Sequence, residues 1–204
     1  MTVKTIIFTG NLCSGKSTAQ NYFEKKGYEC TDADRIVKHV ILSNLRTVIR
    51  RFPEFKLLRF QARKSISNTD QKKIFANITD KVFRDRKLLL RWEKFVHKAV
   101  YKELNKNRLS SKNHKLRLLF IPLYFESHMR LKGTKVVLIF AKRELCLKRA
   151  FKKNVNFAKE RLERQFDFEK TFPHVDFVVF NNHRKKDFLT ALRMLEDILF
   201  KNID

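Results

Sequence analysis

Short apolar runs alternate with longer amphipathic stretches along most of the chain. The first run, TIIF at residues 5–8, is β-branched and apolar, which is typical of a buried parallel strand. Four further runs have strand-like character, namely YECT (28–31), LRLLFIPLYFE (116–126), KVVLIFA (135–141) and VDFVVFNN (175–182). Strands that alternate with helices predict an α/β fold with a parallel, doubly wound sheet.

Apolar residues at helical spacing fill the segments between these runs. A first helix is predicted over 17–26, with Gly27 as its C-terminal cap. Residues 45–112 contain no glycine and a single proline, and their apolar positions recur at helical spacing amid lysine and arginine, which predicts a helical insertion. The charged segment 143–171 and the amphipathic segment 187–200 are also predicted to be helical.

Composition places the chain among folded proteins. A chain of 204 residues with 43% hydrophobic content and 20 phenylalanines can bury a sizeable core. No uncharged apolar stretch reaches about 18 residues, so no membrane-spanning helix is expected. The N-terminus does not resemble a secretory leader, and we expect a cytoplasmic protein. The three cysteines are widely spaced, which suggests neither a disulfide framework nor a zinc site.

The chain is strongly basic. Lysine and arginine number 46 against 21 aspartates and glutamates, which gives a formal net charge of +25. Such an excess can indicate nucleic acid, an acidic membrane surface or a polyanionic substrate. Because the basic residues are spread along the chain, a biased overall composition explains the excess equally well.

The glycine loop that follows the first predicted strand carries the most specific chemical signal. It fits the pattern G-x-x-x-x-G-K-[ST] and consists of Gly10, Asn11, Leu12, Cys13, Ser14, Gly15, Lys16, Ser17 and Thr18. Its glycines allow successive backbone N–H groups to face an anion, and the following helix adds its dipole. Lys16 is expected to reach the β- and γ-phosphates and Ser17 to bind Mg²⁺. The loop predicts binding of a nucleoside triphosphate.

Two acids, Asp32 and Asp34, follow the second predicted strand. On an extended strand end their spacing would point both carboxylates to the same side. One could then accept a proton from a substrate hydroxyl while the other helps to hold the metal. Because DAD precedes the apolar stretch RIVKHVIL, capping of a helix is the alternative role.

Basic residues also cluster after the fourth predicted strand. The cluster contains Arg149, Lys152, Lys153, Arg161 and Arg164. Cations that close over a transferring phosphoryl group stabilise the charge on its oxygens. Taken singly, each of these side chains is more typical of a solvated surface.

Several motifs, in the same order, resemble those of dephospho-CoA kinase, a family of small P-loop kinases. The motifs are GNLCSGKST, DADRIVKHV, KKIFANITDK, IPLYFES, LCLKRAFKKN, ERLERQFDFEK and VDFVVFNN. The resemblance implies a parallel five-stranded P-loop kinase sheet flanked by helices, with a helical acceptor-binding insertion and a helical lid. It implies a core of 1–42, 113–148 and 173–204, an insertion at 43–112 and a lid at 149–172.

The resemblance also implies an activity, which is ATP-dependent phosphorylation of the ribose 3′-hydroxyl of dephospho-CoA with Mg²⁺. Asp34 would be the general base, and Asp32 would lie near the metal and the substrate. Arg149 would reach the phosphates from the lid, with Arg161 as a second cation.

The same resemblance assigns residues to the two substrates. Asn182 would lie near the adenine of ATP, while His97 and Glu126 would line the acceptor pocket. The chain departs from the family pattern at Asn11 and Cys13, where glycine is usual, and at Lys153, where a second lid arginine is usual. Two alternatives therefore stay open, a related nucleoside or nucleotide kinase with another acceptor and a basic P-loop protein that binds nucleic acid.

Overall fold

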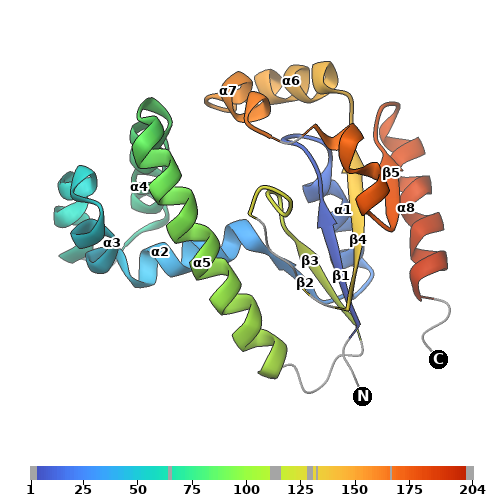
Figure 1. Cartoon of the computed structure of the whole chain (residues 1–204), viewed down its shortest axis with the longest axis horizontal. Coiled ribbons are helices and arrows are strands. Elements are labelled where there is room, and N and C mark those ends of the chain that lie inside the picture. Colours follow the sequence, from blue (N-terminus) through green and yellow to red (C-terminus); the bar gives the residue numbers. More distant parts are fainter. Residues whose placement is uncertain are drawn as a thin grey trace. The chain divides into compact units, whose positions relative to one another are not determined.

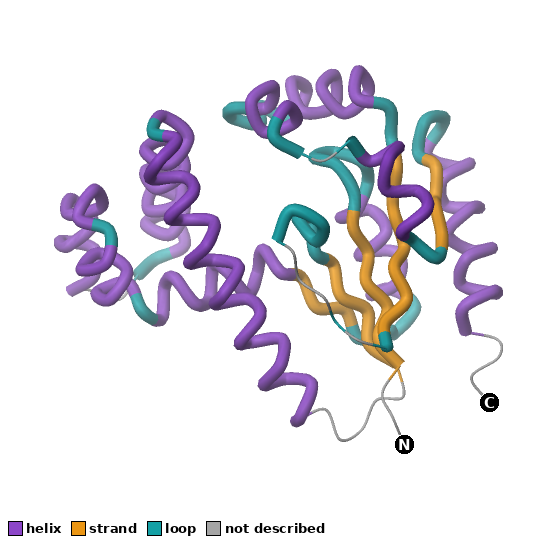
Figure 2. The backbone as a smooth tube through the Cα atoms, in the orientation of Figure 1, coloured by secondary structure: helices purple, strands orange, loops and turns teal. Residues whose placement is uncertain are grey.

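A computed structural model describes residues 4–63, 66–110, 116–127, 131, 133–165 and 167–200. The chain forms two compact units (Figures 1 and 2). The first unit comprises 1–33 and 110–204, and the second comprises 34–109. No helix in the described part of the chain is long and apolar enough to cross a membrane.

The first unit is built on a five-stranded sheet in the order β2-β3-β1-β4-β5. Every strand pair is parallel, as the alternation of apolar runs and helices predicted. The strands are β1 (Lys4–Thr9), β2 (Cys30–Asp32), β3 (Leu116–Phe120), β4 (Thr134–Phe140) and β5 (Phe177–Phe180). Because β1 has β3 on one side and β4 on the other, the loop after β1 emerges at the middle of the carboxyl edge.

Within its described residues this unit has five helical segments, and Figure 1 labels the α-helices among them. They are α1 (Lys16–Lys25), α6 (Arg143–Lys152), α7 (Ala158–Glu163), the 3₁₀ segment η2 (Phe168–His174) and α8 (Lys185–Phe200). One face of the sheet packs against α1 and α8, in a core that includes Phe8, Phe23, Ile139 and Leu192. On the opposite face, Phe172 of η2 packs edge-on against Phe140.

A hydrogen-bonded cluster joins α1, the segment after it and α8. The Tyr22 hydroxyl donates to Glu196 Oε2 at 2.6 Å, and the Tyr28 hydroxyl donates to Glu196 Oε1 at 3.1 Å. The pKa of each tyrosine is raised to about 12, first by burial and then by the hydrogen bond to Glu196 and the negative charge of Glu196. The Glu196 carboxylate thus accepts a hydrogen bond from each of the two tyrosine hydroxyls.

A buried cation lies on β3. Arg117 is only 4% exposed, and its Nη2 donates to the Thr31 hydroxyl of β2 at 3.3 Å. Its Nε is buried without a hydrogen-bond partner among the described residues. Burial lowers the pKa of Arg117, and the negative charge of Glu29 opposes that shift.

The second unit is helical, as the spacing in residues 45–112 predicted. Its elements are α2 (Ala33–Ser43), α3 (Leu45–Arg51), the 3₁₀ segment η1 (Pro53–Arg63), α4 (Asn68–Arg84) and α5 (Arg86–Ser110). Its core centres on three rings, because Trp92 meets Phe52 and Phe55 edge-on with ring centroids 5.2 and 5.3 Å away. Ile74 and Ile78 of α4 belong to the same core.

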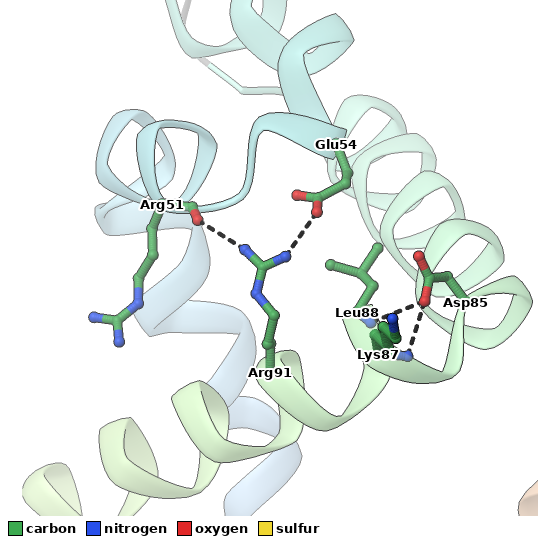
Figure 3. Close-up of polar contacts among 6 residues, drawn as sticks. All are labelled: Arg51, Glu54, Asp85, Lys87, Leu88 and Arg91. Atoms are coloured by element: carbon green, nitrogen blue, oxygen red, sulfur yellow. Dashed lines mark hydrogen bonds and ion pairs between the residues drawn. The ribbon is translucent and has the colours of Figure 1, made fainter.

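Polar contacts fix the turns around this core (Figure 3). Arg91 reaches from α5 to the start of η1 and the end of α3, where it donates to Glu54 Oε1 at 2.9 Å and to the Arg51 carbonyl at 3.4 Å. Asp85 Oδ1 accepts from the backbone N–H groups of Lys87 and Leu88, at 2.8 and 3.1 Å. Asp85 therefore caps the first turn of α5.

Candidate nucleotide-binding site

The loop of residues 10–15 joins β1 to α1, which begins at Lys16. Gly10 and Gly15 have φ values of +145° and +120°, in a region that side chains disfavour. A Cβ at Gly10 would collide with the Ile139 carbonyl, and one at Gly15 would collide with Nδ2 of Asn181. Two of the four glycines in the chain are thus required where they stand.

Hydrogen bonds within the loop hold it in a tight curve. The Ser14 N–H donates to the Asn11 carbonyl at 3.2 Å. The Lys16 ammonium donates to the carbonyls of Gly10 and Asn11, at 2.5 and 2.7 Å. The side chain of Lys16 therefore folds back over the loop and places a positive charge beside it.

Two side chains from distant parts of the sequence also hold the loop. Gln165, which follows α7, accepts from the Leu12 N–H at 2.7 Å. Asn181, which follows β5, donates from Nδ2 to the Ser14 carbonyl at 2.7 Å, and its own N–H donates to the Phe140 carbonyl at 2.8 Å. Neither Gln165 nor Asn181 was predicted as a site residue, because a hydrogen bond to a backbone group leaves no sequence motif.

Arg149 lies on α6 and contacts the same region. Its Nη2 donates to the Asn181 carbonyl at 2.8 Å and approaches Asn181 Oδ1 at 3.5 Å. The positive charges of Arg149 and Lys16 both act to lower the pKa of Cys146, although burial dominates and raises it to about 11. Arg149 and Lys16, two cations that were predicted to bind phosphate, thus both lie near the buried thiol of Cys146.

Several buried polar atoms around the loop have no hydrogen-bond partner within the described residues. They are Arg149 Nη1, Ser14 Oγ and Asn11 Oδ1. Buried polar groups are normally satisfied, so such a group near a curved backbone is where a ligand can supply the missing partner. An anion suits the guanidinium, and the loop, Lys16 and Arg149 together fit the phosphates of a nucleotide.

The two acids differ from the predicted geometry. Asp32 is the last residue of β2 and is half-buried, whereas Asp34 lies exposed in the first turn of α2. The expected extended strand end, with both carboxylates on one side, is therefore wrong. The helix starts at Ala33, and an acid in its first turn interacts favourably with the helix dipole.

The remaining predicted site residues are distributed over both units. Ser17 is exposed and Thr18 half-buried in the first turn of α1. Glu126 is half-buried in the turns after β3, and Arg161 is half-buried on α7.

His97 and Asn182 complete the set. His97 is half-buried on α5 of the second unit. Asn182 Oδ1 accepts from the Lys142 N–H at 2.8 Å, which ties the end of β5 to the start of α6. The first unit thus brings together the loop, Lys16 and Arg149, and Asn181 rather than Asn182 contacts them.

Comparison with known proteins identifies the family of the chain. The family model for dephospho-CoA kinase matches residues 4–187, which include the loop, both acids and Arg149. The chain belongs to the dephospho-CoA kinase family. A dephospho-CoA kinase from Helicobacter pylori (strain 26695) is 32% identical over 188 residues, covering 89% of this chain and 90% of the relative.

Solved structures agree with the family. A dephospho-CoA kinase from Campylobacter jejuni has a TM-score of 0.65 at 25% identity and covers 97% of this chain and 98% of its own. A shikimate kinase from Acinetobacter baumannii, solved with shikimate, has a TM-score of 0.51 at 14% identity, covering 100% and 97% of the two chains. The latter likeness concerns the fold alone.

Proposed function

We propose that this protein transfers the γ-phosphoryl group of ATP to the ribose 3′-hydroxyl of dephospho-CoA, which gives CoA and ADP. The observation that carries the proposal is the complete glycine loop, with Lys16 beside it, inside the region that matches the dephospho-CoA kinase family. A loop of this kind recognises phosphates, and the family supplies the identity of the acceptor.

The first unit holds the nucleotide in this proposal. The loop of residues 10–18 surrounds the phosphates, and Lys16 moves from the loop carbonyls to the β- and γ-phosphate oxygens. Arg149 Nη1, which is buried and lacks a partner among the described residues, donates to the phosphoryl group. Asn182 lies near the adenine.

Mg²⁺ fits the residues present. No group of three or more acidic, histidine or cysteine side chains that could hold a metal occurs in the described ranges. Mg²⁺ needs fewer protein ligands, because phosphates and water complete its shell. Ser17 and Asp32 would hold it, and the bound cation would neutralise negative charge on the phosphates.

Four residues act on the acceptor in this proposal. Asp34, which is exposed in the first turn of α2, accepts the proton of the 3′-hydroxyl as the hydroxyl oxygen attacks the γ-phosphorus. His97 and Glu126 line the acceptor pocket, and Arg161 adds positive charge.

The proposal divides the chain as the family resemblance implies. We assign 1–42, 113–148 and 173–204 to the core, 43–112 to acceptor binding, and 149–172 to a lid that excludes water during transfer.

A coupled assay of ATP consumption tests the proposal. Wild type is offered dephospho-CoA, a panel of nucleosides and nucleotides, or RNA. We expect turnover with dephospho-CoA that Lys16→Ala abolishes. We expect Asp34→Asn to slow turnover by at least about 100-fold while ATP binding is kept, as for loss of a general base. Asp187→Asn, a change to an exposed first-turn acid of α8, is the matched control.

Three other results of this assay would each refute one part of the proposal, namely the acceptor, the kinase activity or the general base. Turnover with another small acceptor alone would replace dephospho-CoA as the substrate. ATP hydrolysis that RNA stimulates, without small-molecule turnover, would favour the nucleic-acid alternative that the +25 charge raises. Turnover of Asp34→Asn within about twofold of wild type would refute the assignment of the base.

A further inference from the structure

Asn181 is a polar residue that contacts the loop of residues 10–15 from outside it. It directly follows β5 and is 9% exposed. Its side chain donates to the Ser14 carbonyl at 2.7 Å, and its backbone carbonyl accepts from Arg149 Nη2 at 2.8 Å. Its backbone N–H is held by the Phe140 carbonyl of β4 at 2.8 Å. One residue, anchored on the sheet, therefore contacts both the loop and the arginine.

The bond to Ser14 fixes the orientation of a peptide plane. In a planar trans peptide the C=O and the following N–H point in opposite directions. Because Asn181 holds the Ser14 carbonyl, the Gly15 N–H is turned to the opposite side, away from Asn181. The N–H of Ser14 itself is already bonded to the Asn11 carbonyl, so the Gly15 N–H is the group whose direction Asn181 decides.

The close approach of Asn181 also explains the second loop glycine. A Cβ on Gly15 would collide with Nδ2 of Asn181, and the φ of +120° disfavours any side chain there. The amide can reach the Ser14 carbonyl only because position 15 is bare. Gly15 and Asn181 thus form a pair in which each requires the other.

The contact with Arg149 links the same residue to the predicted phosphate-binding cation. Nη2 of Arg149 is bonded to the Asn181 carbonyl, which leaves Nη1 buried and without a partner within the described ranges. A guanidinium held by one amino group presents the other in a fixed direction. The backbone carbonyl of Asn181 therefore fixes the orientation of Arg149, while its side chain fixes the orientation of the Ser14–Gly15 peptide.

We propose that Asn181 is a positioning residue for phosphate recognition, which aims the Gly15 N–H and Arg149 at the β- and γ-phosphates of the nucleotide. The inference rests on the proposed kinase function, which it deepens. Asn181 touches no reacting atom itself, because its amide is directed at the Ser14 carbonyl.

Nucleotide binding by three variants tests this role. Asn181→Ala removes the donor, and Asn181→Asp keeps the shape but replaces the donor with a carboxylate oxygen. Asn44→Asp is the matched control, because its amide also donates to a backbone carbonyl, that of Val40 at 3.0 Å, but is exposed in the second unit. Calorimetry would measure the affinity of each for ADP with Mg²⁺ and for AMP, alongside the thermal midpoint.

The expected result separates phosphate recognition from folding. Loss of one buried hydrogen bond that orients a phosphate-binding N–H should weaken ADP about tenfold in Asn181→Ala. Asn181→Asp should weaken ADP further, since it adds repulsion from the Ser14 carbonyl and from the phosphates. AMP, which has no β-phosphate, should change by less than about twofold in both, and Asn44→Asp should match wild type.

Three outcomes would overturn the role. Equal losses for ADP and AMP, or a lowered thermal midpoint with unchanged affinities, would mean that Asn181 serves folding only. A loss confined to Asn181→Asp would mean that charge, not position, is responsible. The kinase function is judged separately, by turnover of dephospho-CoA in wild type, so that nucleotide binding without turnover would refute that function and leave this inference standing.

Discussion

Substitution of Glu196 by glutamine should destabilise the first unit substantially. The carboxylate accepts from both Tyr22 and Tyr28, and its side chain is only 14% exposed. Glutamine keeps one acceptor oxygen and replaces the other with an NH₂ group, which cannot accept from a hydroxyl. One charge-assisted bond is then lost and the other becomes neutral.

The size of the effect follows from these two bonds. A hydrogen bond to a charged group contributes about 1.5–3 kcal/mol, and one between neutral groups contributes about 1 kcal/mol. Loss of one charged bond and weakening of the second sum to about 2–4 kcal/mol of unfolding free energy. That loss is a large share of the stability of a typical domain.

The cluster also predicts how stability changes at high pH. Folded Tyr22 and Tyr28 have pKa values of about 12, against 10.0 for the ordinary side chain. Between pH 10 and 12 the unfolded chain loses phenolic protons that the folded chain keeps. The unfolding free energy contributed by the cluster is therefore complete below pH 10 and falls as pH rises through this window. In Glu196→Gln the decline should be shallower, because the negative charge of Glu196 no longer raises the pKa of either tyrosine.

Urea unfolding followed by far-ultraviolet circular dichroism, at pH 7.5 and at steps from pH 9 to 11.5, measures both effects. Glu163→Gln, the same change at an exposed position of α7, is the control and should lie within about 0.5 kcal/mol of wild type. The reasoning fails if Glu196→Gln matches this control at pH 7.5. It fails equally if wild-type stability stays level between pH 10 and 11.5.

Two other substitutions test single elements. Asp85→Ala removes the acceptor for the N–H groups of Lys87 and Leu88, so the unfolding free energy should fall by about 1 kcal/mol when followed by the fluorescence of Trp92, the single tryptophan. Asp85→Asn should restore most of it, and equal losses would contradict the capping role. Arg117→Met removes a buried cation but keeps the negative charge of Glu29 that acts on it, so by the same urea method the unfolding free energy should fall by about 3 kcal/mol, and a change within about 0.5 kcal/mol would show that the cation is not stabilising.

The sequence predicted those parts of the fold that depend on local pattern. The strand–loop–helix order around the glycine loop is confirmed, because two glycines at fixed spacing after an apolar run leave few other structures open. Within 45–112 the helical prediction is confirmed for the described residues, where apolar positions recur at helical spacing.

Boundaries and contacts between distant residues could not be predicted in this way. The second strand was expected at 28–31 and lies at Cys30–Asp32, and the helix then begins at once, which moves Asp34 out of the strand. Pairing with β3, not local propensity, decides where this short strand starts and ends.

The adjacent asparagines after β5 illustrate the same limit within the site. Asn181 holds the loop, while Asn182 accepts from the Lys142 N–H. Successive side chains at a strand end point in different directions, so the sequence indicates that polar groups follow β5 without telling which of the two meets the loop. Gln165 gave no signal either, because its partner is the backbone of Leu12.

The bonds of the Lys16 ammonium have a consequence for the thermodynamics of ligand entry. In the structure this cation already lies on the carbonyls of Gly10 and Asn11, which hold the loop curved around it. In the proposed function the ammonium leaves these carbonyls for phosphate oxygens, so one set of oxygen partners replaces another. Nucleotide binding is then an exchange of hydrogen-bond partners in a loop that is already folded. The binding free energy does not have to cover the entropy cost of ordering that loop.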